Sequence, residues 1–237
     1  MSGSRPRSLA VISAVITDIE GTTTPVCFVH DVLFPQARAG LPALVRDRGA
    51  EPEVAAALAE VPGPDRLATL LDWMDRDVKA TPLKALQGIL WRDAYASGAV
   101  QGELYPDVAP CLRRWSKAGL RLFVYSSGSV EAQRLLFRHS NSGDLVPLFA
   151  GFFDTGIGAK RDPASYAAIA ISLRLPAAEV LFLSDVDAEL DAAVAAGLQG
   201  CQVVRAGDGT VASAHHPAAA DFRAVSQLFA LTTGAAA

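Results

Sequence analysis

The sequence predicts an α/β protein with a doubly wound, mostly parallel, Rossmann-like sheet and an inserted bundle of α-helices. Three observations lead to this prediction. Short apolar runs alternate with helical patterns in the second half of the chain, which is typical of a parallel sheet covered by helices. A further apolar run stands alone near the N-terminus. Residues 26–106, which separate it from the others, show helical patterns and no convincing strand.

The apolar run Leu9–Ile16 predicts the first buried strand, because runs of this length suit a parallel strand covered on both faces. Arg5 and Arg7 precede the run and loosely imitate a signal peptide. The run ends in Asp18 and Glu20, however, rather than in a small-residue cleavage site. No uncharged apolar run reaches the roughly 18 residues that a membrane helix needs, so no membrane partner is expected.

Residues 26–106 predict a small helical bundle inserted after the first strand. Leucines and alanines recur there at helical spacing, and glycine or proline separates the segments. Asp65 is suited to cap one helix, and Thr81 as N-cap with Pro82 as first residue marks the start of another. The expected helices cover 31–48, 53–60, a segment that starts at 65, and 81 to about 98.

The α/β alternation occupies the rest of the chain. Strands are expected at 120–125, 180–183 and 200–204, and helices at 107–117, 130–139, 162–174, 187–196 and 226–231. Residues 140–159 show no regular pattern and are rich in Gly and Phe. The predicted organisation is therefore a discontinuous α/β core, residues 1–25 and 107–237, interrupted by a helical cap at 26–106.

The composition limits the classes of partner. The chain has 237 residues, of which 51% are hydrophobic and 19% charged, and this is enough for a sizeable core. The formal net charge of −4 lacks the basic footprint of a protein that binds nucleic acid, so no nucleic-acid partner is expected. Cys27, Cys111 and Cys201 are far apart, odd in number and without a CxxC pair. A reducing, cytoplasmic setting is the simplest interpretation.

Polar residues follow three of the predicted strands. They are Asp18 and Glu20 after the first, Ser126 and Ser127 after the second, and Asp185 after a later one. If these strands are parallel neighbours, their ends meet at one edge of the sheet, where α/β folds bind ligands. Asp18 and Glu20 lie two residues apart on an extended backbone, so both carboxylates share one face. They repel each other unless a cation or a proton lies between them.

Phosphoryl transfer is the chemistry that such a cluster predicts. Asp18 would attack phosphorus and form an aspartyl-phosphate. Mg²⁺, a hard cation that prefers oxygen ligands, would neutralise the carboxylates and the substrate phosphate together. Ser126, with the backbone N–H groups of Ser127 and Gly128, would hold phosphate oxygens. Lys160, in a Gly-rich loop just before a helix, would stabilise charge on the transferring group.

Asp185 would complete the metal site from another strand. Each feature also has a structural explanation: an acidic, Thr-rich turn after the first strand, a serine loop that caps a helix, and a solvated loop lysine. Asp185, Glu189 and their acidic neighbours are explained equally by the first turn of a helix, which the helix dipole favours. His30 is either catalytic or structural. The occurrence of all the polar groups in this order, at strand ends, favours an active site.

This order of residues resembles the haloacid dehalogenase superfamily, whose members share an Asp after the first strand, a Ser or Thr after a second, a Lys and a final acid. Its phosphatases usually carry Asp-x-Asp-x-Thr, whereas this chain has Asp18-Ile19-Glu20-Gly21-Thr22. With its Glu, Asp-Ile-Glu-Gly-Thr-Thr-Thr-Pro resembles the enolase-phosphatase (acireductone synthase) family of methionine salvage. Further segments are similar to that family: 28–35, 86–91, 125–133 and 182–186. The similarity spans residues 15 to about 205 and is weakest at 50–66 and after 205.

The resemblance implies a haloacid dehalogenase core with a cap over the active site, Mg²⁺ as cofactor, and a monomer. The family's small phosphorylated substrate is 2,3-diketo-5-methylthiopentyl-1-phosphate, which is first enolised and then dephosphorylated to an acireductone. The implied metal positions are Asp18, Glu20 and Asp185, and the implied substrate-binding positions are Ser126, Ser127 and Lys160. Glu20 would bind the metal through its carboxylate or its backbone carbonyl. Asp18, Glu20 and Lys160 are the expected catalytic residues.

Glu20 is the candidate for acid/base work, because a base must take a proton next to the substrate carbonyl and Glu reaches further than Asp. Phe28, Phe34, Leu86 and Trp91 in the cap are candidates for lining a pocket for the methylthio tail. The alternative is that these four side chains only pack the cap.

Three other functions compete with this assignment. The first is a phosphatase or phosphonatase on the same core that acts on another small phosphorylated substrate. The second is a phospho-accepting signalling domain of receiver type, and the third is an inactive binding protein of this fold. A receiver should lack a large insert after its first strand, and its acceptor Asp should follow a later strand. The helical segment at 26–106 therefore favours a capped active site.

Overall fold

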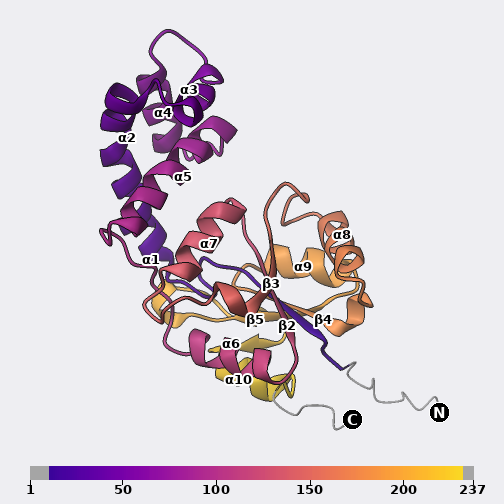
Figure 1. The fold of residues 1–237 in the computed structure, drawn as a ribbon. Coiled ribbons are helices and arrows are strands. Elements are labelled where there is room, and N and C mark those ends of the chain that lie inside the picture. The colour runs from indigo at the N-terminus through magenta and orange to yellow at the C-terminus, as the bar shows by residue number, and fades with distance from the viewer. Residues whose placement is uncertain (1–10, 232–237) are drawn as a thin grey trace, which may run out of the picture.

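A computed structural model describes residues 11–231 of the chain. Within this range the sheet has six strands in the order β3-β2-β1-β4-β5-β6, and every neighbouring pair is parallel (Figure 1). The strands are β1 (Ala14–Thr17), β2 (Arg121–Tyr125), β3 (Phe149–Phe153), β4 (Val180–Ser184), β5 (Gln199–Val203) and β6 (Ala218–Ala219). This arrangement confirms the predicted doubly wound, Rossmann-like α/β class.

Alternating side chains of the central strands enter two apolar clusters, one on each face of the sheet. Val15 of β1 belongs to the cluster with α6 (Val108–Lys117), α7 (Val130–Arg138) and α10 (Phe222–Leu228). Ile16 belongs to the opposite cluster, with α8 (Pro163–Leu173) and α9 (Asp187–Ala195). All four residues of β1 are buried, which explains why this strand is a continuous apolar run in the sequence rather than an alternating one.

Residues 26–96 form a helical segment between β1 and α6. It comprises α1 (Val26–Phe28), a π-helical turn (Val29–Leu33), α2 (Phe34–Arg48), α3 (Pro52–Ala59), α4 (Arg66–Asp75) and α5 (Thr81–Ala96). In Figure 1, α2, α3 and α4 stand clear of the sheet. These helices share an apolar cluster of their own, in which Leu41, Val54, Leu70 and Leu86 are almost fully buried. Among the described residues, no helix is long and apolar enough to cross a membrane.

β3 was missed by the sequence analysis, which expected residues 140–159 to be irregular. The strand reads Phe-Ala-Gly-Phe-Phe, with a glycine at its centre and no β-branched residue. It lies at the edge of the sheet, so its side chains are only partly buried. Residues 9 and 10 of the expected first strand lie outside the described range. Within that range the prediction was too long, because β1 begins at Ala14 and Val11 is 72% exposed. The last helix begins at Phe222, earlier than expected, with Asp221 as its N-cap.

A buried ion pair ties the loop after β1 to the start of α6. Arg205 donates from Nη1 and Nη2 to the two carboxylate oxygens of Asp107, at 2.8 and 3.1 Å. Its Nε and Nη2 also donate to the backbone oxygen of Thr22, at 3.1 and 2.7 Å. Nearby, Asp208 accepts hydrogen bonds from the Val26 N–H and from the Tyr105 hydroxyl. Both connections between the sheet and the helical segment are thereby held by residues that follow β5.

Replacement of Arg205 by Met should lower the free energy of unfolding by about 3–5 kcal/mol, because it leaves the Asp107 carboxylate buried without its partner. Urea unfolding followed by circular dichroism measures the loss. Arg223→Met is the matched control, since Arg223 is exposed on α10. It should change stability by less than about 0.5 kcal/mol. Equal losses in the two variants would contradict the structural role of the ion pair.

Candidate active site

The central strands of the sheet bring three polar side chains to one edge. β1 pairs with β2 on one side and with β4 on the other. Asp18 follows β1, Ser126 follows β2 and Asp185 follows β4. The Asp18 N–H still donates to the Leu183 oxygen at 2.9 Å, which fixes the backbone of Asp18 against β4. The ends of these parallel strands form the crevice in which α/β sheets bind ligands.

Lys160 lies between two buried carboxylates. Its Nζ is 2.6 Å from Oδ1 of Asp18 and 2.7 Å from Oε2 of Glu189. The three side chains are only 9%, 7% and 11% exposed, respectively. Burial by itself would lower the pKa of Lys160, but the two carboxylates outweigh it and the pKa lies above its ordinary value. The ammonium group is therefore charged and held against Asp18.

The loop that carries Lys160 is fixed through its backbone oxygens. The hydroxyl of Tyr125 donates to the Gly158 oxygen at 2.9 Å, and the hydroxyl of Tyr166 donates to the Lys160 oxygen at 2.7 Å. Gly158 has φ +141°, and a Cβ at this position would lie 2.2 Å from Oγ of Ser165. Glycine is therefore needed at this point of the loop.

Glu189 is the functional-site residue that the sequence analysis missed. The sequence analysis explained it by the dipole of the helix to which it belongs. Its Oε2 accepts a hydrogen bond from Oγ of Ser184 at 2.9 Å in addition to the contact with Lys160. Burial, followed by the charge of Asp18, raises its pKa to about 7. No signal in the sequence separates Glu189 from Asp187, the other acid in the first turn of α9.

Asp154 is a second residue that the sequence did not single out, because it follows the unpredicted strand β3. Its Oδ2 accepts from the N–H of Val130 at 3.2 Å, and its Oδ1 accepts from the N–H of Gly156 at 2.8 Å. One carboxylate thus holds the first residue of α7 and the loop that leads to Lys160. Asp154 positions two parts of the site without facing the cavity described below.

Asp185 lies against the loop that follows Asp18. The Thr22 hydroxyl donates to Oδ1 of Asp185 at 3.4 Å. Gly21 has φ +68°, and a Cβ there would come within 2.5 Å of Oδ2 of Asp185, so only glycine permits this approach. Burial, and then the charge of Asp18, raise the pKa of Asp185 to about 6. A cation that lies between two neighbouring carboxylates reduces the electrostatic repulsion between them.

The donor set at this edge fits a divalent cation such as Mg²⁺, which commonly takes one or two carboxylates and keeps several water ligands. Asp18 and Asp185 supply the carboxylates. Within residues 11–231, no cluster of three or more His, Cys, Asp or Glu side chains is arranged to hold a metal. Glu20 thus forms no such side-chain cluster with Asp18 and Asp185.

Glu20 instead lines a cavity of about 90 Å³ between the strand ends and the helical segment. Ser126 and Ser127 also line it, and so do charged or polar side chains of the helical segment, Lys79, Lys84 and Gln87. The apolar side chains of the wall include Val29, Leu33, Phe34, Trp91 and Leu136. Burial, and then the charge of Asp18, raise the pKa of Glu20. Of the four apolar side chains considered for a methylthio pocket, Phe34 and Trp91 line this cavity. Phe28 and Leu86 are buried in the apolar clusters and do not line it.

The loop after β2 is internally bonded in a way that the sequence did not predict. The N–H of Gly128 donates to Oγ of Ser126 at 3.1 Å, so this N–H is directed at the serine rather than outward. Nε2 of Gln133 donates to the oxygens of Gly128 and Phe153, at 2.8 and 2.9 Å. On the other side, Nζ of Lys84 in α5 donates to the Ser127 oxygen at 3.1 Å. The helical segment and the serine loop are therefore in direct contact.

Comparison with known proteins agrees with this geometry. The family model of haloacid dehalogenase-like hydrolases matches residues 12–197. Enolase-phosphatase E1 of Granulibacter bethesdensis is 56% identical over 223 residues, which cover 92% of this chain and 96% of that protein. The protein of the same name from Acidiphilium cryptum is 58% identical over 219 residues, which cover 91% and 94%. The chain belongs to the enolase-phosphatase E1 family.

Solved structures support the same family assignment. The UTR4 protein of Saccharomyces cerevisiae superposes with a TM-score of 0.79 at 34% identity, covering 89% of this chain and 98% of that one. CbbY from Rhodobacter sphaeroides, at 19% identity and a TM-score of 0.59, shares the fold alone. Membership of the enolase-phosphatase E1 family confirms the resemblance that the Asp-x-Glu motif predicted. It also excludes the receiver-type signalling domain, so the chain is a phosphatase of the hydrolase class.

The two raised carboxyl pKa values predict a pH-dependent stability for the metal-free protein. Asp185 and Glu189 have pKa values of about 6 and about 7 in the folded chain, against ordinary values of 3.8 and 4.5. The folded state therefore binds more protons than the unfolded state in this range, and stability should fall as pH rises from about 4 to about 7. Thermal unfolding in the presence of a chelator measures this. Glu189→Gln should flatten the upper part of the curve, and a melting temperature that rises through this window would contradict the assignment.

Proposed function

We propose that this chain is a Mg²⁺-dependent, bifunctional enolase-phosphatase of methionine salvage. It would convert 2,3-diketo-5-methylthiopentyl-1-phosphate, through an enol phosphate, to acireductone and phosphate. The observation that carries this proposal is the juxtaposition of two sets of groups. Asp18, with Lys160 at 2.6 Å, lies at the end of β1 beside Asp185. Glu20 lines an adjoining cavity whose wall includes the apolar side chains of Leu33, Phe34 and Trp91, which suit a methylthio tail.

Dephosphorylation rests on Asp18 as nucleophile. The Ile19 N–H and the Lys160 ammonium both bind Oδ1, at 2.8 and 2.6 Å, whereas Oδ2 has only a longer contact with Oγ of Ser184, at 3.4 Å. We therefore assign the attack on phosphorus to Oδ2. The phosphorus–oxygen ester bond breaks, the enol oxygen leaves and takes a proton, and an aspartyl-phosphate remains. Water then attacks the phosphorus, releasing phosphate and restoring the carboxylate. Lys160 and the Ser126 hydroxyl bind the oxygens of the transferred group.

Mg²⁺ bound by Asp18, Asp185 and the Glu20 carbonyl would neutralise charge on the phosphate and polarise the substrate carbonyl. The donor set supports this assignment, since two carboxylates and a backbone oxygen leave positions for water and substrate. The Glu20 carboxylate then remains available for the first half-reaction. It takes a proton from carbon 1 of the substrate, and its raised pKa makes it a better base than an exposed glutamate.

The helical segment at 26–106 would be the cap of this enzyme, and residues 1–25 with 107–237 its catalytic core. The separate apolar cluster of helices α2–α5 supports these boundaries, as do the bonds that tie both connections to the residues after β5. Since the cap and the core both line the cavity of Glu20, the substrate would be enclosed between the two. We place the enzyme in the cytoplasm as a monomer, with a small phosphorylated substrate as its partner.

The decisive experiment measures phosphate release from the diketo phosphate and from a generic aryl phosphate, with and without Mg²⁺. Ultraviolet absorbance follows the enol in parallel. We expect Mg²⁺-dependent turnover, an enol that appears before acireductone, and a strong preference for the diketo phosphate. Comparable turnover of both substrates without an enol would instead support the alternative, a phosphatase of this superfamily with another small phosphorylated substrate.

Glu20→Gln should slow enol formation by about 10²–10⁴-fold, since the variant lacks the base but keeps the backbone carbonyl. Hydrolysis of the aryl phosphate needs no enolisation and should fall much less. Glu103→Gln is the control, because Glu103 is exposed and lies outside the cavity. Retained enolisation with lost dephosphorylation in Glu20→Gln would contradict the role of Glu20 as base.

A further inference from the structure

The enolisation proposed above develops negative charge on a carbonyl oxygen of the diketone. Mg²⁺ is assigned to polarise this carbonyl, and a cation of the protein beside the same oxygen would stabilise the transition state further. Lys160 does not supply it, because Lys160 does not line the cavity of Glu20 and its ammonium, 2.6 Å from Asp18 and 2.7 Å from Glu189, serves the transferred phosphoryl group. A protein cation for the enolate oxygen would instead face the cavity that Glu20 lines.

Several side chains of that cavity wall carry donors, but most of them are occupied. Lys84 donates to the Ser127 oxygen at 3.1 Å and thereby joins α5 to the serine loop. The amide of Gln133 donates to two backbone oxygens, at 2.8 and 2.9 Å. Gln87 is neutral and provides a weaker donor than an ammonium group. Lys79 is the remaining lysine among the described residues that line this cavity.

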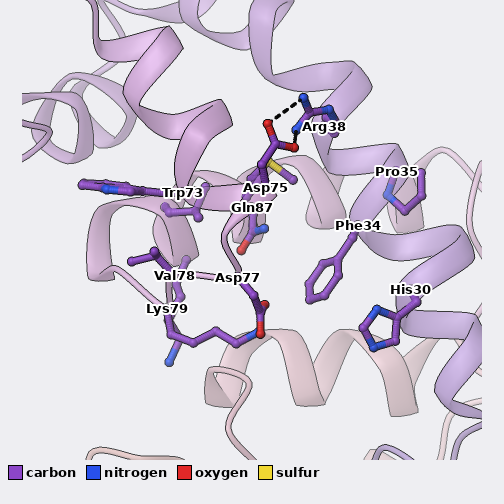
Figure 2. Close-up of a pocket in the computed structure, with 13 residues that line it drawn as sticks. His30, Phe34, Pro35, Arg38, Trp73, Asp75, Asp77, Val78, Lys79 and Gln87 are labelled. Carbon is purple, nitrogen blue, oxygen red and sulfur yellow. Dashed lines mark hydrogen bonds and ion pairs between the residues drawn. The ribbon is translucent and has the colours of Figure 1, made fainter.

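Lys79 lies in the loop between α4 and α5, at the wall shared by two cavities. It lines the cavity of Glu20 and also a neighbouring cavity of about 230 Å³ within the cap. Figure 2 shows Lys79 beside Asp77 in this second cavity, with Phe34, Gln87 and His30 around the same space. The Nζ of Lys79 is 5.1 Å from the centre of the Phe34 ring. The side chain thus belongs to the wall that the two cavities share.

The present contact of Lys79 is one that a substrate can replace. Its Nζ is 2.5 Å from Oδ1 of Asp77, but the two side chains are 55% and 72% exposed. Exposed ion pairs of this kind contribute little, and the lysine stem is flexible.

We propose that Lys79 is a catalytic residue of the enolase half-reaction, whose ammonium group neutralises the enolate oxygen of the diketone. This role rests on the proposed function. Glu20 takes the proton from carbon 1, and the electron pair of that bond forms the carbon 1–carbon 2 double bond. The carbonyl electron pair moves to the oxygen, where Lys79 stabilises it. The proton then passes from Glu20 to this oxygen and gives the enol, so nothing is oxidised or reduced.

Two probes separate the half-reactions. A phosphonate analogue of the diketo phosphate, with methylene in place of the bridging oxygen, can enolise but cannot release phosphate. Exchange of its carbon 1 hydrogens with deuterated solvent, followed by NMR, reports enolisation alone. Hydrolysis of an aryl phosphate reports phosphoryl transfer alone. Lys79→Met should slow the exchange by about 10²–10³-fold, the size of effect expected for one oxyanion partner. Its effect on kcat/KM for the aryl phosphate should be at least tenfold smaller.

Two variants serve as controls. Lys117→Met removes an equal charge from an exposed position on α6 and should alter neither reaction. Lys79→Arg keeps the charge and should exchange faster than Lys79→Met. Exchange in Lys79→Met within threefold of wild type would overturn the proposal, and so would equal losses on both probes, which would indicate a structural role in the cap. No exchange in the wild type would reject the proposed function itself.

Discussion

Asp18→Asn should lose phosphate release from both the diketo phosphate and an aryl phosphate, by at least about 10⁴-fold, as expected when a nucleophile is removed. The carboxamide keeps the shape of the side chain and still accepts the Ile19 N–H through its oxygen. It lacks, however, the negative charge needed to attack phosphorus. Since Lys160 and Ser126 remain in place, binding of the phosphate should survive while its transfer does not.

Acid quenching provides the direct measurement for this variant. The wild type should show a phosphoenzyme that is stable in acid and labile in base, as an acyl phosphate is, and Asp18→Asn should show none. Asp187→Asn is the matched control, since Asp187 is exposed at the start of α9, two residues from Asp185. Equal phosphate release by Asp18→Asn and Asp187→Asn would reject Asp18 as nucleophile.

The same substitution should also lower the pKa values of Asp185 and Glu189. Burial is the largest cause of their raised values and would persist, but the charge of Asp18 is the next largest in both cases. The stability of metal-free Asp18→Asn should therefore depend less on pH between about 4 and 7 than that of the wild type. The charge of Asp18 therefore influences the protonation of Asp185, the predicted metal ligand, and of Glu189, the partner of Lys160.

The sequence predicted the parts of the site that follow from strand ends. Asp18, Ser126 and Asp185 each follow an apolar run, and parallel pairing of those runs is enough to bring the three together. Glu189 and Asp154 were not predicted because their roles depend on partners from distant segments. Glu189 looks like an ordinary helix-start acid until Lys160 is placed beside it. Asp154 depends on β3, whose edge position gave its sequence no clear strand pattern.

The sequence predicted that residues 26–106 are helical. It did not predict the contacts that attach this helical segment to the sheet. Phe28, Val29 and Leu33 at one end, and Ala94 and Tyr95 at the other, pack into the apolar cluster of the sheet. Arg205 is a charged residue just after a strand, and nothing in its neighbourhood in the sequence indicates that it is 5% exposed. Its buried pairing with Asp107 appears only when the chain returns from the cap. The periodicity of the sequence therefore predicts the helices and strands. The hydrogen bonds and ion pairs between them can be identified only in the folded structure.

Lys160→Met should be costly for both activity and stability. Activity should fall by about 10²–10³-fold through loss of charge stabilisation on the transferring group. Stability near pH 8 should fall by about 3–5 kcal/mol, because removing one partner leaves buried charges uncompensated. Asp18 and Glu189 would then face each other without the ammonium group that now lies between them.

The stability loss in Lys160→Met should depend on pH in a defined direction. Glu189 already has a pKa of about 7, and burial and Asp18 are what raise it while Lys160 lowers it. Without Lys160 the pKa rises further, so the folded variant gains stability from a proton on Glu189 at low pH and loses it as pH rises through that higher value. Urea unfolding at pH 5.5 and pH 8 should give a smaller deficit at the lower pH.

The double variant Lys160→Met, Glu189→Gln separates the structural from the catalytic contribution of Lys160. The neutral amide removes one of the two unpaired charges and still accepts a hydrogen bond from Ser184, so stability at pH 8 should recover in part. Phosphate release should not recover, because the cation is still missing. A deficit in Lys160→Met that is the same at both pH values, and is unchanged in the double variant, would show that the two carboxylates are not what Lys160 stabilises.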